Sequence, residues 1–292
     1  MTSLASRCAW GELSWPELIE QLLALGRTDI PLARLTEGHI DAVRILTEAG
    51  LAPQEGLYGV WASRSGGTGV RGTHEDQHWV LDGKLRFASG AGVIDRALLP
   101  VEADGQAQLL DVGVRDWEFE DDWRTPAMAG SRSFSASLDG LAAEARAVGP
   151  DDFYLSRTGF HPGGIGVAAV WVGGAQRVLD LLERARARRS QNEITQARLG
   201  RARLEIASAA AACRQGAVLV DKCPPEQLRQ LATECRGVTG AAVRRILTDV
   251  RELAGPAGLA YEQELSAAID DLQMYVGQQN ADSDAMFLGA PS

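Results

Sequence analysis

The sequence predicts an α+β, multi-layer protein in which N-terminal helices precede a small antiparallel β-barrel and a C-terminal four-helix bundle. Two observations predict this order. Apolar residues recur at helical spacing before about residue 54 and after about residue 160. The region between them has short alternating runs and tight-turn dipeptides, which are typical of short strands. We therefore expect an N-terminal helical region at 1–54, a β-barrel domain at 55–150 and a helical bundle at 151–292.

The N-terminal region has the start and stop patterns of two helices. Ser14-Trp15-Pro16-Glu17 is typical of a capping box, with Ser14 at the N-cap and Glu17 at N3. Gly26 is expected to end this first helix, and the second is expected to run from near Pro31 to Gly50. Apolar residues at helical spacing support both: Leu18, Leu22 and Leu25, then Leu32, Leu35, Ile40, Val43 and Leu46.

The middle region contains two dipeptides that favour β-hairpin turns. Asp82-Gly83 and Asp104-Gly105 each stand between short apolar runs, and Asp-Gly accepts the positive φ that a type I′ turn requires. Residues 131–138 alternate polar and apolar side chains and predict a further strand. Short strands joined by tight turns indicate a small antiparallel barrel or sandwich.

The C-terminal region predicts four long helices, near 165–182, 193–220, 225–253 and 258–276. Pro224-Pro225 and Gly255-Pro256 supply breaks between them, so an antiparallel bundle is expected. Residues 177–203 hold eight arginines against three acids. Such a segment can face a phosphate group, or it can be the solvated face of a helix, which is the more common case.

Charge and cysteine content exclude several classes of function. The chain has 292 residues, of which 45% are hydrophobic, so a large core can be buried. Its formal net charge of −10 argues against nucleic acid and anionic membranes as partners. The four cysteines fit neither a zinc ribbon nor a disulfide framework. The N-terminus lacks the apolar core of a signal peptide, and we expect a cytoplasmic protein.

One local match, His74-Glu75-Asp76-Gln77-His78, has the H-E-x-x-H pattern of zinc peptidases. That chemistry needs both histidines on one helix face, whereas this segment runs directly into Trp79-Val80-Leu81 and is expected to be loop and strand. Two glycine-rich stretches, 66–69 and 163–166, lack the G-x-G-x-x-G and G-K-[ST] spacings. A zinc peptidase is therefore kept only as a third hypothesis, and nucleotide binding of those two kinds is unsupported.

The order of regions and several local stretches resemble the acyl-CoA dehydrogenase family of flavoproteins, over roughly residues 28–292. Residues 82–91 (DGKLRFASGA) are similar to the family's N-G-x-K-x-[WF]-I-T-N-A hairpin. Residues 123–131 (WRTPAMAGS) resemble its G-M-R-G-S strand entry, and residues 173–180 (GGAQRVLD) resemble the start of its main bundle helix.

The resemblance implies FAD as cofactor, with three groups of contacting residues. Phe87, Ala88 and Ser89 would lie against the flavin ring, Phe87 shielding one face and Ser89 offering a hydrogen bond near N5. The remaining contacts would come from two other segments: Trp61, Ala62 and Ser63, in the first flavin-contacting strand and loop; and Ser131 and Arg132, along the diphosphate and adenosine. The implied reaction is α,β-dehydrogenation of an acyl thioester, in which the cofactor carries the redox step.

Removal of an α-proton requires a carboxylate base. The family places this base at one of two positions. The first corresponds to 163–167, which has no acid. The second lies within 273–284, where Asp282 and Asp284 are the candidates and Asn280 replaces the histidine of some relatives. The T-E-P-x-A-G-S-D and R-x-x-F-G motifs are also missing. The alternative is therefore a catalytically degenerate member that serves as a non-catalytic partner subunit. The implied partners are acyl-CoA or a related acyl substrate, a homo-oligomer or a heteromer with a related subunit, and an electron-transfer partner.

Overall fold

The computed structural model describes residues 10–64, 68–76, 78–187 and 192–290. The chain forms two compact units. The sheet unit comprises Met1–Glu12, Leu35–Thr125 and Ala129–Phe160; the helical unit comprises Leu13–Arg34, Pro126–Met128 and His161–Ser292. The N-terminal helices are thus shared between the units, because the division falls inside the second helix, α3 (Ile30–Glu48).

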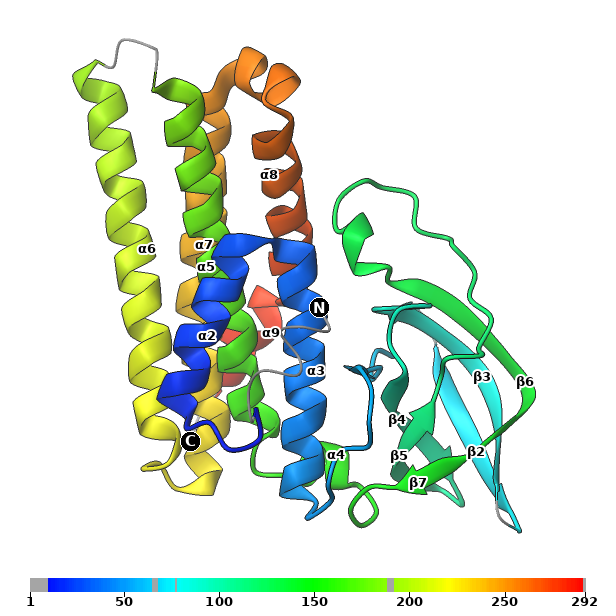
Figure 1. Cartoon of the computed structure of the whole chain (residues 1–292). Coiled ribbons are helices and arrows are strands. Elements are labelled where there is room, and N and C mark those ends of the chain that lie inside the picture. Colours follow the sequence, from blue (N-terminus) through cyan, green and yellow to red (C-terminus); the bar gives the residue numbers. More distant parts are fainter. Residues whose placement is uncertain (1–9, 65–67, 77, 188–191, 291–292) are drawn as a thin grey trace. The chain divides into compact units, whose positions relative to one another are not determined.

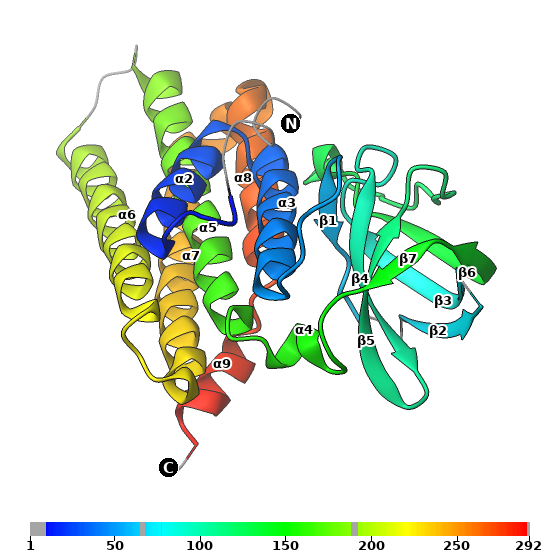
Figure 2. The same cartoon turned by 60° about the horizontal axis from the view of Figure 1, so that its bottom comes forward.

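The sheet unit contains one seven-stranded sheet in the order β6-β3-β2-β4-β5-β7, with β1 paired to β4 (Figure 2). The strands are β1 (Tyr58–Val60), β2 (Gly69–Glu75), β3 (His78–Ala88), β4 (Arg96–Ala103), β5 (Gln106–Gly113), β6 (Phe134–Ala143) and β7 (Ala145–Ala147). Within the described residues β6 and β7 do not pair with each other, so the sheet is not closed and the expected small barrel is not confirmed. It is also mixed, because β4 pairs in parallel with both β1 and β2.

The two Asp-Gly dipeptides have different roles. Asp104 and Gly105, with φ of 51° and 80°, join β4 to β5, which confirms that hairpin. Asp82-Gly83 instead lies inside β3 beside a register shift, so that predicted turn is wrong. Gly83 has φ of 139°, and a Cβ there would come within 2.2 Å of the Gly69 carbonyl oxygen. The glycine therefore serves a bulge and a close backbone approach.

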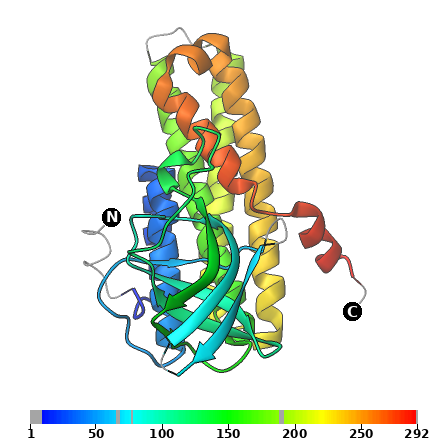
Figure 3. The ribbon, with the colours of Figure 1, turned by 90° about the vertical axis from the view of Figure 1, so that its right-hand side faces the viewer.

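The helical unit is built on four long helices, which confirms the expected helical C-terminal region (Figure 1). They are α5 (Phe160–Arg186), α6 (Glu193–Val220), α7 (Leu228–Tyr261) and α8 (Gln263–Val276). The expected break at Gly255-Pro256 is a kink inside α7, where Gly255 has φ of 61°. A short helix that the sequence did not predict, α9 (Ala281–Leu288), follows α8 and leaves its direction (red in Figure 3).

The first helix, α2 (Trp15–Thr28), begins with the predicted capping box: Ser14 accepts from the Glu17 N–H, and the Glu17 carboxylate accepts from the Ser14 N–H at 2.9 Å. Gly26 does not end it. A Cβ on Gly26 would lie 2.3 Å from the Val170 carbonyl oxygen, and one on Gly173 would lie 2.2 Å from the Leu23 carbonyl oxygen. These glycines let α2 and α5 approach backbone to backbone.

By length and composition α5 could span a bilayer, but 78% of its apolar window is buried in the structure. Its apolar character is explained by the core of the bundle. Trp171 is fully buried there and meets Tyr275 of α8 edge to face, with ring centroids 6.2 Å apart.

Candidate functional site

Trp61 connects two of the three segments that were predicted to hold a cofactor. It directly follows β1, and its backbone N–H donates to the Leu98 carbonyl at 2.9 Å. Its indole Nε1 donates to the Ser89 carbonyl at 3.0 Å, while its ring packs edge-on to Phe119. The side chain is only 3% exposed, so the end of β1 and the end of β3 are held together by a buried hydrogen bond.

Three buried serine hydroxyls connect the third segment. Ser133 Oγ lies 2.8 Å from both Ser89 Oγ and Ser131 Oγ, and all three residues are at most 8% exposed. Backbone bonds run alongside, from the Gly90 N–H to the Ser131 carbonyl at 2.8 Å. The structure thus brings the predicted 61–63, 87–89 and 131–132 segments together in the sheet unit. Ser133 was missed, although its alternation with Ser131 placed both on one face of the predicted strand.

The exposed position of Phe87 coincides with a break in the regular pairing of β3. A register shift between Leu85 and Ala88 breaks the pairing of β3 with β6, and bulges of this kind redirect side chains. Phe87 has φ of 59° and is 48% exposed, and its ring meets that of Trp123 edge to face with centroids 6.0 Å apart. A bulky residue in the left-handed region costs on the order of 1–2 kcal/mol. Strained residues cluster at functional sites, so the exposed Phe87 ring is a candidate contact for a ligand.

Arg132 shares this conformation. Its φ is 45°, its Nε donates to the Ala91 carbonyl at 2.8 Å, and its guanidinium lies 4.9 Å from the centre of the Phe134 ring. The predicted residue Ala88 is fully buried, whereas Ala62 and Ser63 are half-buried. The site therefore combines a buried hydrogen-bonded network with two exposed groups at its surface, the Phe87 ring and the Arg132 guanidinium.

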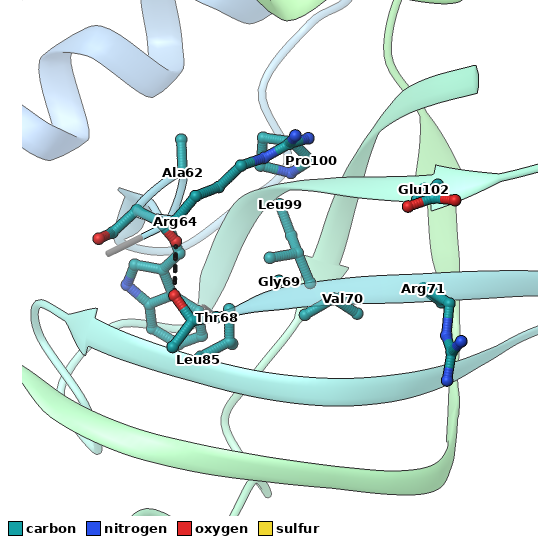
Figure 4. A pocket seen from close by; sticks show the side chains of 12 residues that line it. Ala62, Arg64, Thr68, Gly69, Val70, Arg71, Leu85, Leu99, Pro100 and Glu102 are labelled. Atoms are coloured by element: carbon teal, nitrogen blue, oxygen red, sulfur yellow. Dashed lines mark hydrogen bonds between the residues drawn. The ribbon is translucent and has the colours of Figure 1, made fainter. Parts of the chain in front are cut away.

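A pocket of about 160 Å³ opens beside Trp61, where β4 exchanges its parallel neighbour β1 for β2. Figure 4 shows the Arg64 side chain reaching toward Pro100 and the Arg71 side chain farther along β2, with Leu99 and Val70 between them. Thr68 closes one side by donating to the Ser63 carbonyl at 3.4 Å. The lining combines an apolar floor with two guanidinium groups and the Glu102 carboxylate. The complete lining is Trp61, Ala62, Ser63, Arg64, Thr68, Gly69, Val70, Arg71, Leu85, Leu99, Pro100 and Glu102.

The two candidate bases, Asp282 and Asp284, lie in the helical unit, in the first turn of α9. Asp282 is exposed, and Asp284 is half-buried and accepts from Gln279 Nε2 at 3.0 Å. Asn280 caps this helix by accepting from the Ser283 N–H at 2.9 Å, which gives that position a structural role. The alternative position, 163–167, lies inside α5.

A half-buried carboxylate that the sequence did not single out is Asp271 on α8. It accepts from the Met128 N–H at 2.5 Å, and burial raises its pKa, aided by the charges of Asp29 and Asp270. Asp270 pairs instead with Arg251, 3.1 Å away, so the two adjacent carboxylates have different partners. Met128 itself has φ of 55°, so Asp271 stabilises a strained turn.

The H-E-x-x-H segment has no helix. His74 lies on β2 opposite Trp79 and His78 lies on β3 opposite Glu75, while Gln77 lies outside the described residues. In the described part of the chain no group of three or more His, Cys, Asp or Glu side chains could hold a metal ion. The zinc-peptidase hypothesis therefore has no structural support.

Comparisons with known proteins point to one fold. Residues 153–276 match the family described as acyl-CoA dehydrogenase, C-terminal domain. The dibenzothiophene monooxygenase TdsC from Paenibacillus sp. A11-2, solved with FMN and indole, has a TM-score of 0.82 at 16% identity over 94% of this chain and 82% of its own. The 3-HSA hydroxylase from Rhodococcus sp. RHA1 has a TM-score of 0.76 at 13% identity over 97% and 85%.

The nitrososynthase from Micromonospora carbonacea var. africana has a TM-score of 0.77 at 15% identity over 94% of this chain and 81% of its own. A sequence comparison with curated proteins finds no match. These comparisons confirm the expected resemblance, and at such identities they show the fold.

Proposed function

Because this chain has the acyl-CoA dehydrogenase fold and its residues 153–276 match that family's C-terminal domain, we propose that it is a flavin-dependent oxidoreductase. The observation that carries the proposal is the joining of 61–63, 87–89 and 131–133 by the Trp61 hydrogen bond and the serine chain. The exposed ring of Phe87 lies beside this hydrogen-bonded network. The strained backbone and the exposure of Phe87 fit a surface that binds a planar group. The flavin would supply the redox chemistry, and the chain would bind and orient it.

Within this proposal Phe87 provides a face for the flavin ring, and Ser89 lies directly behind it. The serine hydroxyls join the end of β3 to the segment that precedes β6. The surface that would contact the flavin ring is therefore rigid before any ligand binds. Such preorganisation lowers the entropic cost of binding. Ser131 and Arg132 follow on the same surface, with the Arg132 guanidinium providing positive charge for a phosphate.

The type of flavin is a finer part of the proposal. The family resemblance implies FAD, whereas TdsC has been solved with FMN. Much of the arginine-rich segment is already paired inside the helical unit: Arg186 donates to the Leu253 carbonyl at 2.6 Å, Arg198 to Glu252 at 2.7 Å and Arg203 to Glu183 at 2.8 Å. These partners leave fewer guanidinium groups for a diphosphate, which favours FMN.

Acyl-thioester dehydrogenation is one candidate reaction, and it depends on Asp282 or Asp284 as the base. A base for a carbon acid works best when burial raises its pKa. Asp282 is exposed, Asp284 is half-buried and accepts from Gln279, and the 163–167 segment has no acid. Oxygenation of a small organic substrate is the second candidate, because it does not require removal of an α-proton by a carboxylate. The neighbours named as monooxygenase and hydroxylase support it.

One experiment tests binding and separates these reactions. The purified protein is mixed with FMN or FAD and filtered, and its visible spectrum is recorded; flavin bands on the protein support the proposal. Anaerobic bleaching of the bound flavin by an acyl-CoA would identify a dehydrogenase. Oxygen-dependent substrate oxidation in the presence of reduced flavin, without bleaching by acyl-CoA, would identify an oxygenase. Protein that retains neither flavin would overturn the proposal and leave the non-catalytic partner subunit.

A further inference from the structure

Two cysteines face each other in the core of the helical unit. Cys213 on α6 and Cys235 on α7 have Sγ atoms 3.9 Å apart, and the residues are 0% and 5% exposed. They lie on neighbouring helices that pack together along the bundle (Figure 1). The pair takes no part in the flavin surface, which belongs to the sheet unit.

The surroundings give the two sulfurs different chemistry. The Cys235 thiol donates to Cys213 Sγ, and Thr239 Oγ1 lies 3.7 Å from the same sulfur. The bond from Cys235 lowers the pKa of the Cys213 thiol, and burial and the same bond raise that of Cys235. A thiol with a lowered pKa is the nucleophile of such a pair, and its neighbour is the resolving thiol.

A glycine, which has no side chain, borders one of the two sulfurs. Gly216 stands beside Cys235, and a Cβ at that position would lie 3.6 Å from the Cys235 sulfur. A disulfide needs a separation of about 2.0 Å, so the two sulfurs must move about 1.9 Å closer together. Hydrogen peroxide is close to water in size, so small openings of the bundle are enough for it to enter.

We propose that Cys213 and Cys235 form a reversible intramolecular disulfide when the protein meets hydrogen peroxide. The Cys213 thiolate attacks one peroxide oxygen, the O–O bond breaks, and the hydroxide released takes up a proton to become water, which leaves a sulfenic acid. Cys235 sulfur then attacks the Cys213 sulfur, the S–O bond breaks, and a second water departs with the Cys235 proton. Two thiols and one peroxide thus give one disulfide and two waters, and a dithiol reductant reverses the change. This modification site does not depend on flavin binding.

Peptide mapping of the full-length protein tests the proposal. After peroxide treatment and blocking with N-ethylmaleimide, trypsin should release Leu204–Arg214 joined to Gln230–Arg236, lighter than their sum by two hydrogens. Dithiothreitol should separate them. Cys223 lies in a third peptide, Cys223–Arg229, and serves as an internal control for general oxidation. The double variant Cys8→Ser, Cys223→Ser removes the other thiols and should cross-link at the same rate as the wild type.

Two results would overturn the proposal. One is that both core peptides carry N-ethylmaleimide as in untreated protein, while Cys223 has been oxidised. The other is Cys213 converted to sulfinic acid with no cross-link. In Cys235→Ala the cross-link should vanish and Cys213 should gain a single oxygen instead; since the wild-type map alone decides the matter, the test does not depend on the folding of this variant.

Discussion

The indole of Trp61 donates a hydrogen bond to the backbone carbonyl of Ser89 across 3.0 Å, and so links the end of β1 to the turn after β3. Both partners are buried, which makes this bond sensitive to the loss of its donor. Replacement by phenylalanine keeps the aromatic packing and leaves the carbonyl without that donor.

Trp61→Phe should therefore lower the free energy of unfolding by about 1–3 kcal/mol and weaken flavin retention. Trp79→Phe is the matched control, since Trp79 is half-buried against the same apolar cluster and outside the site. Urea unfolding and flavin titration measure the two effects. Equal losses in both variants would mean that the Ser89 bond has no special role.

Phe87→Gly should separate stability from binding. Glycine accepts the left-handed conformation of residue 87 without strain, so the net gain in the free energy of unfolding should be about 0.5–1 kcal/mol. Flavin affinity should fall because the exposed ring is lost. Leu155→Ala removes a comparably exposed apolar side chain from the same unit and should leave flavin affinity unchanged. A Phe87→Gly variant that binds flavin as tightly as the wild type would contradict the role of this ring.

Ser133→Ala should disturb the serine chain at its middle. The substitution removes the hydroxyl that meets both Ser89 and Ser131, and the cost should be about 1–3 kcal/mol. Ser137→Ala, at an exposed position that donates to Glu120 at 3.3 Å, should change the free energy of unfolding by less than about 0.5 kcal/mol. Thermal unfolding of both variants, with and without flavin, checks the difference. Similar curves for the two would show that the chain does not stabilise the site.

Asp271 should make stability depend on pH in a defined direction. Because its pKa is raised in the folded state, the folded protein holds this proton more tightly than the unfolded chain does. Its contribution is therefore favourable at low pH and is lost as pH rises from about 4 through the raised value. Asp271→Asn keeps an oxygen for the Met128 N–H and should gain stability over the wild type as pH rises through this window.

Asp270→Asn should narrow this pH window from its upper end, because the charge of Asp270 is one of the causes that raise the pKa of Asp271. Denaturant unfolding between pH 4 and 8 makes the comparison. An Asp271→Asn gain that is the same at every pH would contradict the assignment.

Gly26→Ala should destabilise the helical unit, because its Cβ would collide with the backbone of α5. An overpacked contact of this kind costs about 1–3 kcal/mol. Gly200→Ala, on α6 with no atom within 4 Å of the added Cβ, should instead stabilise by up to about 1 kcal/mol. Thermal unfolding distinguishes the two, and a neutral Gly26→Ala would mean that α2 and α5 do not approach so closely.

Local chemistry predicted much of the fold. The Ser14 capping box, the Asp104-Gly105 hairpin and the long amphipathic helices are set by neighbouring residues, and the structure has them all. Features set by distant residues were not predictable. Gly26 has the appearance of a helix stop, and Asp82-Gly83 that of a turn, yet both glycines are required by close approach of a remote backbone.

The candidate site was predictable in part for the same reason. The family resemblance led to Trp61, Phe87, Ser89 and Ser131, which the structure brings together in one unit. Ser133 was missed because its importance comes from two remote hydroxyls. Whether the sheet closes depends on pairing between β6 and β7, and no local pattern reports that.

Flavin titration of the purified wild-type protein tests the central claim most directly. The protein is added to a fixed concentration of FMN, and in parallel FAD, while flavin fluorescence and the visible spectrum of the retained protein are followed. We predict saturable binding of one flavin per chain, with FMN bound more tightly and with Phe87→Gly weakened. The account would be contradicted if folded protein left the fluorescence of both flavins unchanged and remained colourless after filtration.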